Sequence, residues 1–363
     1  MKTLALTLLL SVTCFSNYAQ VAPARYDTVL QRLGREFSED TLTAGLSIGI
    51  HYKGDTWFYN FGKGNPTQSS IYEIGSITKT FAGLVLAHAV SESKVALDDD
   101  IRKYMKGNFP NLMYNGEPIR LVNLANTSSC LPDNLLTGPD MGFTRDNFFT
   151  ALAGIKPDTI PGTKTHHSNT AAMLLSLILE NIYKEPIDML IQRYVLDPLQ
   201  MTNTSFGSAA TPMQMMTGYN AAGKAVPYLT ATLMKGTGSM RSNSTDMVKY
   251  LSYLQKQETQ ETRMVLTPTV TVDASTNKVR EPVSMDLVND RVYALSLNWL
   301  QYHPGKNQLR IWTDGGTAGF RSYIVMYPEK QLSFIFLSNR TGEKVLDKLY
   351  NIGLRISQLV PTE

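Results

Sequence analysis

The chain has 363 residues, of which 43% are hydrophobic and 18% charged, and its formal net charge at pH 7 is +3. This composition is typical of a folded globular protein with a large core and excludes a disordered or fibrous chain. A charge so close to zero, without a run of Lys or Arg, excludes a nucleic-acid-binding protein. The length favours two closely packed domains over one.

Residues 1–20 have the pattern of an export signal. MKTLALTLLLSVTCFSNYAQ begins with one Lys, continues with an apolar stretch too short to cross a bilayer with margin, and ends in small or polar residues. We expect cleavage near Ala19 or Gln20 and a periplasmic or secreted protein. The alternative is a lipoprotein acylated at Cys14, although the residues before Cys14 match such a site poorly. If Cys14 is removed, Cys130 is the only cysteine left and no intrachain disulfide can form.

The next elements are a helix, a hairpin and a second helix. An amphipathic helix at 23–40 is followed by a β-hairpin at 44–64 and by an apolar helix at 73–90. The hairpin turns at Lys53-Gly54-Asp55. The 73–90 stretch is too short for a membrane span, and no other segment after the leader resembles one.

From about residue 95 to 234 the pattern is mainly helical, with loops rich in Pro, Gly and Asn. The remaining segments are predicted as helices at 170–184, 187–199, 245–257 and 344–360, and as strands within 291–303, 307–316, 320–330 and 331–339. Strand segments at both ends and helices in the middle indicate an α+β fold, in which both termini complete one antiparallel sheet. We therefore predict a sheet domain from 21–94 and 235–363, with a mainly helical domain inserted at 95–234.

A Ser and a Lys stand one helical turn apart at the start of the 73–90 helix. At i and i+3, Ser76 and Lys79 share one helical face. The positive end of the helix dipole stabilises an alkoxide and opposes the charge of a nearby ammonium, so that Lys79 can accept a proton near neutral pH. The pair indicates nucleophilic catalysis. The alternative is that Ser76 only caps the helix, because the S-x-x-K spacing also occurs at 91–94 and 275–278, in polar stretches.

Other motifs are weaker indications of a site. Ser47 lies in a G-x-S-x-G pattern, but the chain continues as a hairpin where a nucleophile elbow would turn into a helix, so we expect an ordinary strand residue. The five His lack the spacing of a zinc site, and no cofactor is expected. TDGGTAGF at 313–320 precedes a strand, which disfavours a phosphate loop. It is either a tight strand connection or an edge where the N–H groups of Gly315 and Gly316 face a substrate.

GSITK in this setting resembles the active-site helix of the serine β-lactamase and penicillin-binding-protein superfamily, in particular the class C β-lactamase, esterase and D-Ala-D-Ala carboxypeptidase branch. The resemblance extends over nearly the whole mature chain in the same order. The segments similar to that branch are KVALDDDIRKYM, LANTSSCLPDN with Cys130 at the usual Gly, PGTKTHHSNTAAMLLSLILE, YVLDPLQMTNTSF, MTGYNAAGKAVP, GTGSMRSNSTDMVKYL and TDGGTAGF.

The resemblance implies roles for several residues. Ser76 would attack a carbonyl and form an acyl-enzyme, with Lys79 sharing the proton transfer. The backbone N–H groups of Ser76 and Gly316 would form the oxyanion hole. Asn169 would hold the substrate amide and Lys79.

Two positions depart from the family's pattern. His167 stands where the family has its catalytic Tyr, and Thr313 stands where it has a Lys or His. An imidazole can perform acid–base work near neutral pH and would tend to stay neutral beside Lys79. His167 is therefore either a working base, directly or through a water, or a sign of lost activity. His166 is expected to be a bystander.

The missing cation bears on the substrate. Thr313 cannot pair with the carboxylate of a β-lactam or of a D-Ala-D-Ala terminus, which favours neutral esters or amides. Asp314 makes the site more acidic. Arg321 is near in sequence and is a candidate substrate-binding residue, although the sequence does not show whether its guanidinium reaches the site.

We therefore expect an exported serine hydrolase that forms an acyl-enzyme with a small ester, amide or peptide substrate. The alternative is a catalytically impaired relative that serves as a receptor for cell-wall fragments or for a partner. Two of the family's three motifs are altered: the second, at His167 to Asn169, and the third, at Thr313 to Gly315. A third possibility is acyl transfer to an alcohol or amine at the same site. The sequence leaves the oligomeric state open.

Overall fold

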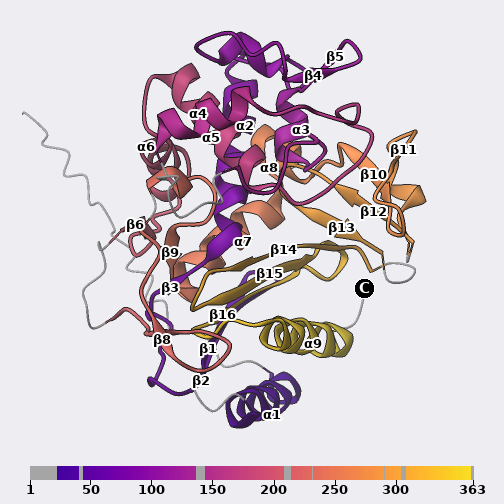
Figure 1. Ribbon diagram of the computed structural model, residues 1–363. Coiled ribbons are helices and arrows are strands. Elements are labelled where there is room, and N and C mark those ends of the chain that lie inside the picture. The colour runs from indigo at the N-terminus through magenta and orange to yellow at the C-terminus, as the bar shows by residue number, and fades with distance from the viewer. Residues whose placement is uncertain are drawn as a thin grey trace, which may run out of the picture.

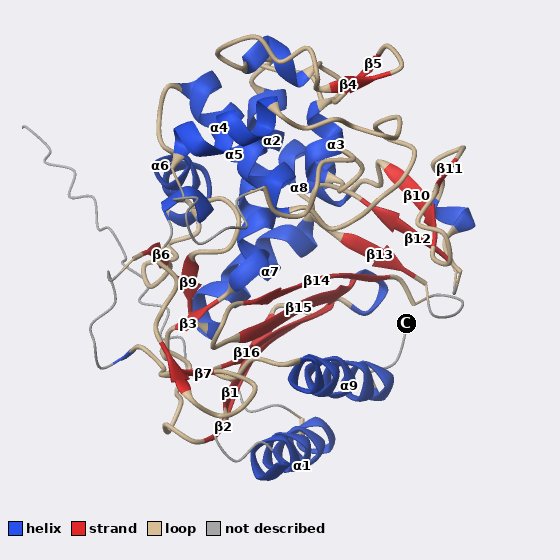
Figure 2. Cartoon of the chain, in the orientation of Figure 1, coloured by secondary structure: helices blue, strands red, loops and turns tan. Residues whose placement is uncertain are grey.

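The computed structural model describes residues 23–40, 44–135, 144–207, 214–230, 232–289, 291–303 and 308–360. The predicted leader at 1–20, with Cys14, lies outside these residues. Figures 1 and 2 show a twisted sheet between two layers: two helices cover one face and a thicker helical layer covers the other. None of the helices in the described ranges is long and apolar enough to cross a membrane.

The sheet contains nine strands in the order β11-β10-β12-β13-β14-β15-β16-β1-β2, and neighbouring strands pair in antiparallel fashion. The strands are β1 (Gly45–Tyr52), β2 (Asp55–Gly62), β10 (Val270–Asp273), β11 (Val279–Arg280), β12 (Val292–Leu295), β13 (Leu300–Tyr302), β14 (Arg310–Gly316), β15 (Arg321–Tyr327) and β16 (Leu332–Ser338). β1 pairs with β16, with Leu46 opposite Ser338. The N-terminal hairpin thus completes a sheet whose other strands come from the C-terminal third, as predicted.

The helices are α1 (Ala24–Asp40), α2 (Thr78–Ser91), α3 (Leu121–Ala125), α4 (Arg145–Ala153), α5 (Asn169–Tyr183), α6 (Ile187–Ile191), α7 (Ser244–Lys256), α8 (Gln260–Leu266) and α9 (Glu343–Leu359). Short 3₁₀ or π turns are η1 (Gly75–Ile77), η2 (Ile101–Tyr104), η3 (Gln192–Leu196), η5 (Thr232–Met234), η6 (Met285–Leu287) and η7 (Pro328–Lys330). Small strand groups are β3 (Tyr72–Glu73) and β6 (Ser205–Phe206) on either side of β9 (Met240–Ser242), β4 (Met113–Tyr114) with β5 (Glu117–Pro118), and β7 (Gly218–Tyr219) with β8 (Ala225–Val226).

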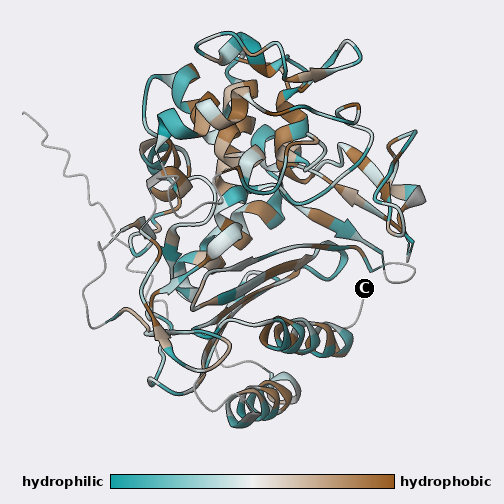
Figure 3. Ribbon diagram, viewed as in Figure 1, coloured by the Kyte–Doolittle hydropathy of each residue, from teal (hydrophilic) through white to brown (hydrophobic). Residues whose placement is uncertain are grey.

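The central strands are buried on both faces because each face carries its own core. Side chains alternate along a strand, so Tyr323 and Val325 pack in the core beneath α1 and α9, whereas Ile324 and Met326 pack in the core beneath the helical layer. Figure 3 shows hydrophobic residues concentrated within the helical layer, while α1 and α9 carry both hydrophobic and hydrophilic residues. The two-layer cover explains the near-continuous apolar sequence of β15 and β16.

Helix α2 runs through the interior of the helical layer (Figure 1). α2 is buried along most of its length, and the predicted core residues Ile77, Phe81, Leu84 and Val85 are fully inaccessible. It packs against α5, α6 and α8. Burial on all sides gives a rigid support whose first turn is fixed against the sheet by η1 and β14.

Several predicted elements have different boundaries in the structure. The strand predicted within 291–303 is two strands, β12 and β13, joined by a turn in which Asn298 has φ +65. The helix predicted at 187–199 is α6 followed by the π turn η3. α8, β10 and β11 were not predicted. The division into a sheet domain and an inserted domain at 95–234 remains a prediction.

Candidate active site

η1 and the end of β14 hold the start of α2 in close backbone contact. A Cβ added to Gly315 would lie 2.0 Å from the carbonyl oxygen of Ile74, and one added to Gly75 would lie 2.4 Å from the nitrogen of Gly316. Gly75 also has φ +52, which L side chains rarely adopt. The Ser322 hydroxyl donates to the Ile74 carbonyl at 2.8 Å. Glycine is therefore needed wherever the two segments cross.

The crossing places Ser76 at the floor of an open site. The nitrogen of Ser76 lies 2.9 Å from the Cβ position of Gly315, so this amide and that of Gly316 belong to adjoining stretches of backbone. Preorganised backbone N–H groups are the usual donors to the oxyanion of an acyl-transfer reaction. The predicted oxyanion hole has its two backbone segments in place, and the pairing of their N–H groups on one oxygen remains a prediction.

Lys79 contacts Ser76 directly. The Nζ of Lys79 donates to the Oγ of Ser76 at 2.7 Å, and the lysine side chain is buried. Burial lowers the pKa of Lys79 to about 8, against the opposing charges of Asp133 and Asp314. Because the pKa lies near neutrality, the amine can both give and take a proton at the serine oxygen.

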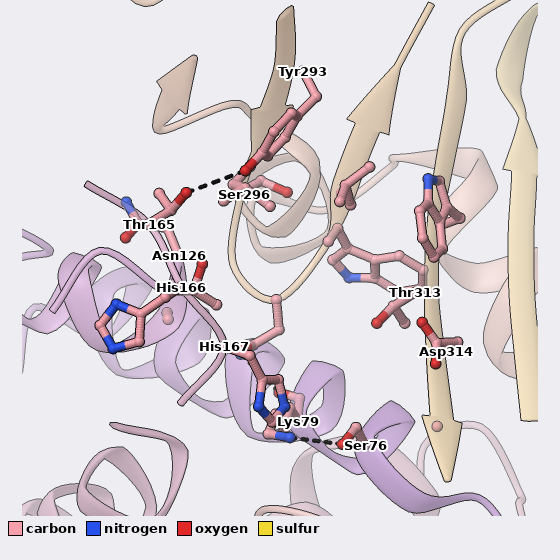
Figure 4. Close-up of a pocket in the computed structure, with 18 of the residues that line it drawn as sticks. Ser76, Lys79, Asn126, Thr165, His166, His167, Tyr293, Ser296, Thr313 and Asp314 are labelled. Atoms are coloured by element: carbon pink, nitrogen blue, oxygen red, sulfur yellow. Dashed lines mark hydrogen bonds between the residues drawn. The ribbon is translucent and has the colours of Figure 1, made fainter. Parts of the chain in front are cut away.

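His167 lies on the loop before α5, with its ring near Lys79 (Figure 4). Its Nδ1 forms a hydrogen bond of 2.8 Å with Oδ1 of Asp133. Although 59% of the His167 side chain is exposed, partial desolvation by the surrounding cleft is the main cause that lowers its pKa; Lys79 lowers it further, whereas Asp133 and Asp314 raise it. The imidazole is therefore poised to be neutral near pH 7, as the sequence predicts.

Two cavity residues near His167 in the sequence form hydrogen bonds to the loop at 131–134. His166 forms a hydrogen bond of 2.5 Å between Nε2 and the Leu131 carbonyl, consistent with a bystander. The side-chain nitrogen of Asn169 donates to Oδ1 of Asn134 at 3.2 Å. The resemblance implies that this amide contacts Lys79. Its observed partner is instead Asn134, an acceptor on the neighbouring loop.

Strand β14, which carries TDGG at 313–316, divides its residues between two faces. Gly315 faces η1, so alternation places Thr313 on the same face and Asp314 on the face of α9. Tyr350 of α9 donates to Oδ1 of Asp314 at 3.1 Å. Burial raises the pKa of Asp314, against the effects of Tyr350 and Arg321. Thr313 thus lies on the face of β14 toward η1, at the position where the resemblance implies a cation.

Arg321 reaches the cleft from the α9 face. It pairs with Gly316 across the β14–β15 ladder, and its guanidinium lies 2.3 Å from the Cβ position of Gly316. One of its nitrogens is 4.0 Å from Oδ2 of Asp314. A guanidinium on this face does not replace the Lys or His of the third motif, which would project from Thr313.

One cavity of about 560 Å³ contains all eight residues named from the sequence: Ser76, Lys79, His167, Asn169, Thr313, Gly315, Gly316 and Arg321. Its apolar wall is formed by Ala125, Tyr293, Leu295, Trp299, Leu300 and Trp312. The wall and Asp133 were not identified as functional from the sequence. Asp133 stands in LPDN, a segment quoted for its resemblance, but nothing local in the sequence indicates its contact with His167.

Two alternative sites receive no support. Ser47 lies buried in β1, where its hydroxyl bonds Oδ1 of Asn60 at 2.8 Å and Tyr72 at 2.9 Å, so it is a structural strand residue as predicted. Across the described ranges, no three or more His, Cys, Asp or Glu side chains are grouped so that they could hold a metal ion.

The α+β fold and a Ser–Lys pair at the base of this cleft define a serine hydrolase of the β-lactamase-related superfamily. The Beta-lactamase family model matches residues 30–355, and the chain belongs to that family.

Curated relatives cover most of the chain. A β-lactamase of Pseudomonas fluorescens is 26% identical over 325 residues, which are 82% of this chain and 88% of the relative. The D-alanyl-D-alanine-carboxypeptidase/endopeptidase AmpH of Escherichia coli (strain K12) is 28% identical over 304 residues, 81% of this chain and 77% of the relative.

Solved structures agree with the fold. A class C β-lactamase superimposes with a TM-score of 0.79 at 18% identity, covering 95% of this chain and 99% of the other. A β-lactamase/D-alanine carboxypeptidase from Pseudomonas syringae gives 0.75 at 19% identity, covering 92% and 99%. The predicted antiparallel sheet flanked by helices is confirmed.

Proposed function

We propose that the protein is an exported serine hydrolase that forms an acyl-enzyme on Ser76 with a neutral ester or peptide-like amide. The observation that carries the proposal is the 2.7 Å contact between Lys79 Nζ and Ser76 Oγ within the 560 Å³ cavity. A serine hydroxyl is a weak nucleophile by itself and needs an adjacent group that takes its proton.

Acylation uses both Lys79 and His167. As Ser76 Oγ attacks the carbonyl carbon, its proton passes to Lys79, and Lys79 passes one of its own protons to the neutral His167. Lys79 remains an ammonium, His167 becomes an imidazolium, and the negative charge moves to the carbonyl oxygen, beside the N–H groups of Ser76 and Gly316. When the tetrahedral intermediate breaks down, the same relay returns a proton to the leaving alcohol or amine.

Deacylation reverses these roles. A water gives a proton to His167 and attacks the acyl carbon, and the bond to Ser76 Oγ then breaks. The serine oxygen recovers a proton through Lys79, and the carboxylic acid leaves. Each group ends the cycle in its starting protonation state, so that no co-reactant other than water is needed.

The cavity favours substrates without a carboxylate next to the scissile bond. The position of the family's cation is Thr313, and both carboxyl groups that act on Lys79, those of Asp133 and Asp314, disfavour a further negative charge. The indole of Trp312 and the phenol ring of Tyr293, both partly exposed, offer apolar surface to an acyl or leaving group. The relatives named β-lactamase and carboxypeptidase support hydrolysis at a carbonyl, whereas Thr313 favours the neutral members of that range.

The test compares the unmodified protein with Ser76→Ala on a panel of chromogenic neutral esters, a chromogenic β-lactam and a D-Ala-D-Ala peptide. We expect ester hydrolysis by the unmodified protein, weaker turnover of the two carboxylated substrates, and loss of hydrolysis on the order of 10³-fold or more in Ser76→Ala. Equal rates for the two proteins would exclude Ser76 as the nucleophile.

The same samples distinguish the other functions. A receptor would bind a muropeptide saturably, while a fluorophosphonate would leave Ser76 unlabelled. An acyltransferase would give an ester or amide product when an alcohol or amine is added, and a hydrolase would release the free acid.

Export rests on the leader-like residues 1–20. If the leader is cleaved, the intact mass of the exported protein should correspond to a chain that begins near Ala19 or Gln20. A mass that retains Cys14 with added lipid would instead establish the lipoprotein alternative.

A further inference from the structure

A carboxylate outside the family's three motifs contacts the histidine that replaces the tyrosine. Oδ1 of Asp133 accepts from the backbone nitrogen of Asn169 at 3.1 Å and bonds Nδ1 of His167 at 2.8 Å. Asn169 is the first residue of the 15-residue helix α5. The helix start stabilises a negative charge, and the bond from the Asn169 N–H holds the carboxylate in place.

The loop that carries Asp133 is fastened to the loop that carries His167. The Ser168 hydroxyl donates to the Pro132 carbonyl at 2.9 Å, and the backbone nitrogen of Thr170 donates to the Asp133 carbonyl at 2.9 Å. His166 bonds the Leu131 carbonyl at 2.5 Å. These bonds come from both sides of His167, so the distance between its ring and Asp133 is set by the backbone of two joined segments.

We propose that Asp133 is a positioning residue that holds His167 in the tautomer with the proton on Nδ1 and the lone pair on Nε2. An ionised carboxylate only accepts hydrogen bonds, so the ring nitrogen that faces it must carry the proton. The free Nε2 is then the atom that takes the proton relayed from Lys79. The inference rests on the proposed function, in which His167 is the base.

The substitution of Tyr by His explains why such a carboxylate is needed. A phenol has one oxygen and no tautomers, whereas an imidazole presents a base at Nε2 only when its other nitrogen carries the proton. The charged groups that act on His167 are Lys79 of α2, Asp133 of the facing loop and Asp314 of β14. Asp133 is the one with a hydrogen bond to the ring, and it stabilises the imidazolium formed during each step.

The test places Asp133→Asn in two backgrounds, the native protein and His167→Tyr, and measures kcat, KM and the pH profile on the most reactive neutral ester. An Asn offers Nδ1 either a neutral amide oxygen, which is a weaker acceptor than the carboxylate, or, if its amide turns over, an N–H donor; both weaken the preference for the proton on Nδ1. We expect kcat to fall roughly 10- to 100-fold with little change in KM in the native background, and to change less than about 2-fold in the His167→Tyr background. Asp158→Asn, the same change at an exposed carboxylate that does not line the cavity, should leave both backgrounds unaltered.

The pH profile adds a readout that loop damage would not reproduce. Asp133 raises the pKa of His167, so its loss should move the acid limb of kcat/KM to lower pH in the native background only. Asp133→Glu should recover part of the rate, because it restores an acceptor-only group.

A measurement without turnover completes the test. Long-range proton–nitrogen correlation spectra of ¹⁵N-His-labelled protein report which ring nitrogen carries the proton. We expect Nδ1–H at His167 in the native protein and a larger share of Nε2–H in Asp133→Asn. Equal losses of kcat in both backgrounds, or Nε2–H in the native protein, would overturn the positioning role while leaving Ser76 as nucleophile. An unmodified protein that neither hydrolyses the esters nor labels at Ser76 would overturn the proposed function, and this inference with it.

Discussion

Lys79 Nζ lies 2.7 Å from Ser76 Oγ, and both side chains project from the same turn where η1 passes into α2. The lysine is buried, and that burial lowers its pKa to about 8. A cation in this position stabilises the serine alkoxide, and a cation of moderate acidity can also exchange protons with it. The charge of Lys79 and its capacity for proton exchange can be separated by substitution.

Lys79→Arg separates charge from proton exchange. Arginine keeps the positive charge but does not deprotonate in proteins, so the relay through this position stops. We expect kcat on a neutral ester to fall on the order of 10³-fold, with the thermal unfolding temperature measured in parallel. Lys94→Arg, at another S-x-x-K spacing but on an exposed residue, is the matched control. A Lys79→Arg protein with nearly native kcat would exclude the proton relay.

The pH profile of kcat/KM should be bell-shaped. Activity requires a neutral His167, whose pKa is held below its ordinary value by burial and by Lys79, so the rate rises with pH through that limb. It also requires the Lys79 ammonium, so the rate falls again as pH passes about 8. In His167→Tyr we expect the acid limb assigned to the imidazole to disappear while turnover is preserved or raised. A His167→Tyr protein less active than His167→Ala would contradict a base at this position.

Thr313→Lys should restore affinity for carboxylated substrates. The side chain projects from the face of β14 that also holds Gly315 against η1, so an ammonium there lies on the side of Ser76, the proposed nucleophile. We expect kcat/KM for a chromogenic β-lactam to rise about 10-fold or more, with little change for a neutral ester, since one charge-assisted contact contributes about 1.5–3 kcal/mol. Thr202→Lys, at an exposed position outside the cavity, serves as control. A gain for both substrate classes alike would show that the cation does not act on the carboxylate.

Gly75→Ala should damage stability and catalysis together. Its φ is +52, and its Cβ would lie 2.4 Å from the Gly316 nitrogen. The end of β14, which carries the Gly316 N–H, must therefore move. Gly54→Ala is a comparison for backbone strain alone, because its φ is +94 but nothing lies within 4 Å of its Cβ position. We expect Gly54→Ala to cost about 1 kcal/mol with kcat intact, and Gly75→Ala to cost about 3 kcal/mol with kcat lowered at least about 10-fold. Denaturant unfolding and ester kinetics measure the two effects, and equal behaviour of the two variants would contradict the close crossing.

The parts of the fold and site that could be predicted are those with local signals. Ser76 and Lys79 are three residues apart on one helix, and β1 with β2 shows an alternation interrupted by a glycine turn. The split between β12 and β13 was missed because Asn298 takes a left-handed φ within an otherwise strand-like sequence. Asn tolerates this conformation, but its presence alone does not require a turn.

The contacts that could not be predicted depend on the tertiary arrangement. Asp133 and His167 are 34 residues apart and meet only because α3 and α5 bring their flanking loops together. Asp314 and Tyr350 are separated by 36 residues and meet across the α9 face. The face from which Arg321 approaches follows from the β14–β15 register, which the sequence of either strand does not contain.

The nucleophilic role of Ser76 is tested most directly by catching the covalent intermediate. The protein would be mixed with a slowly hydrolysed neutral ester, quenched in acid within the first turnovers, and examined by intact-mass and peptide mass spectrometry. We predict a transient gain equal to the acyl group, located on the peptide that contains Ser76 and absent from Ser76→Ala. Steady ester hydrolysis without an adduct, retained in full by Ser76→Ala, would contradict an acyl-enzyme at this serine.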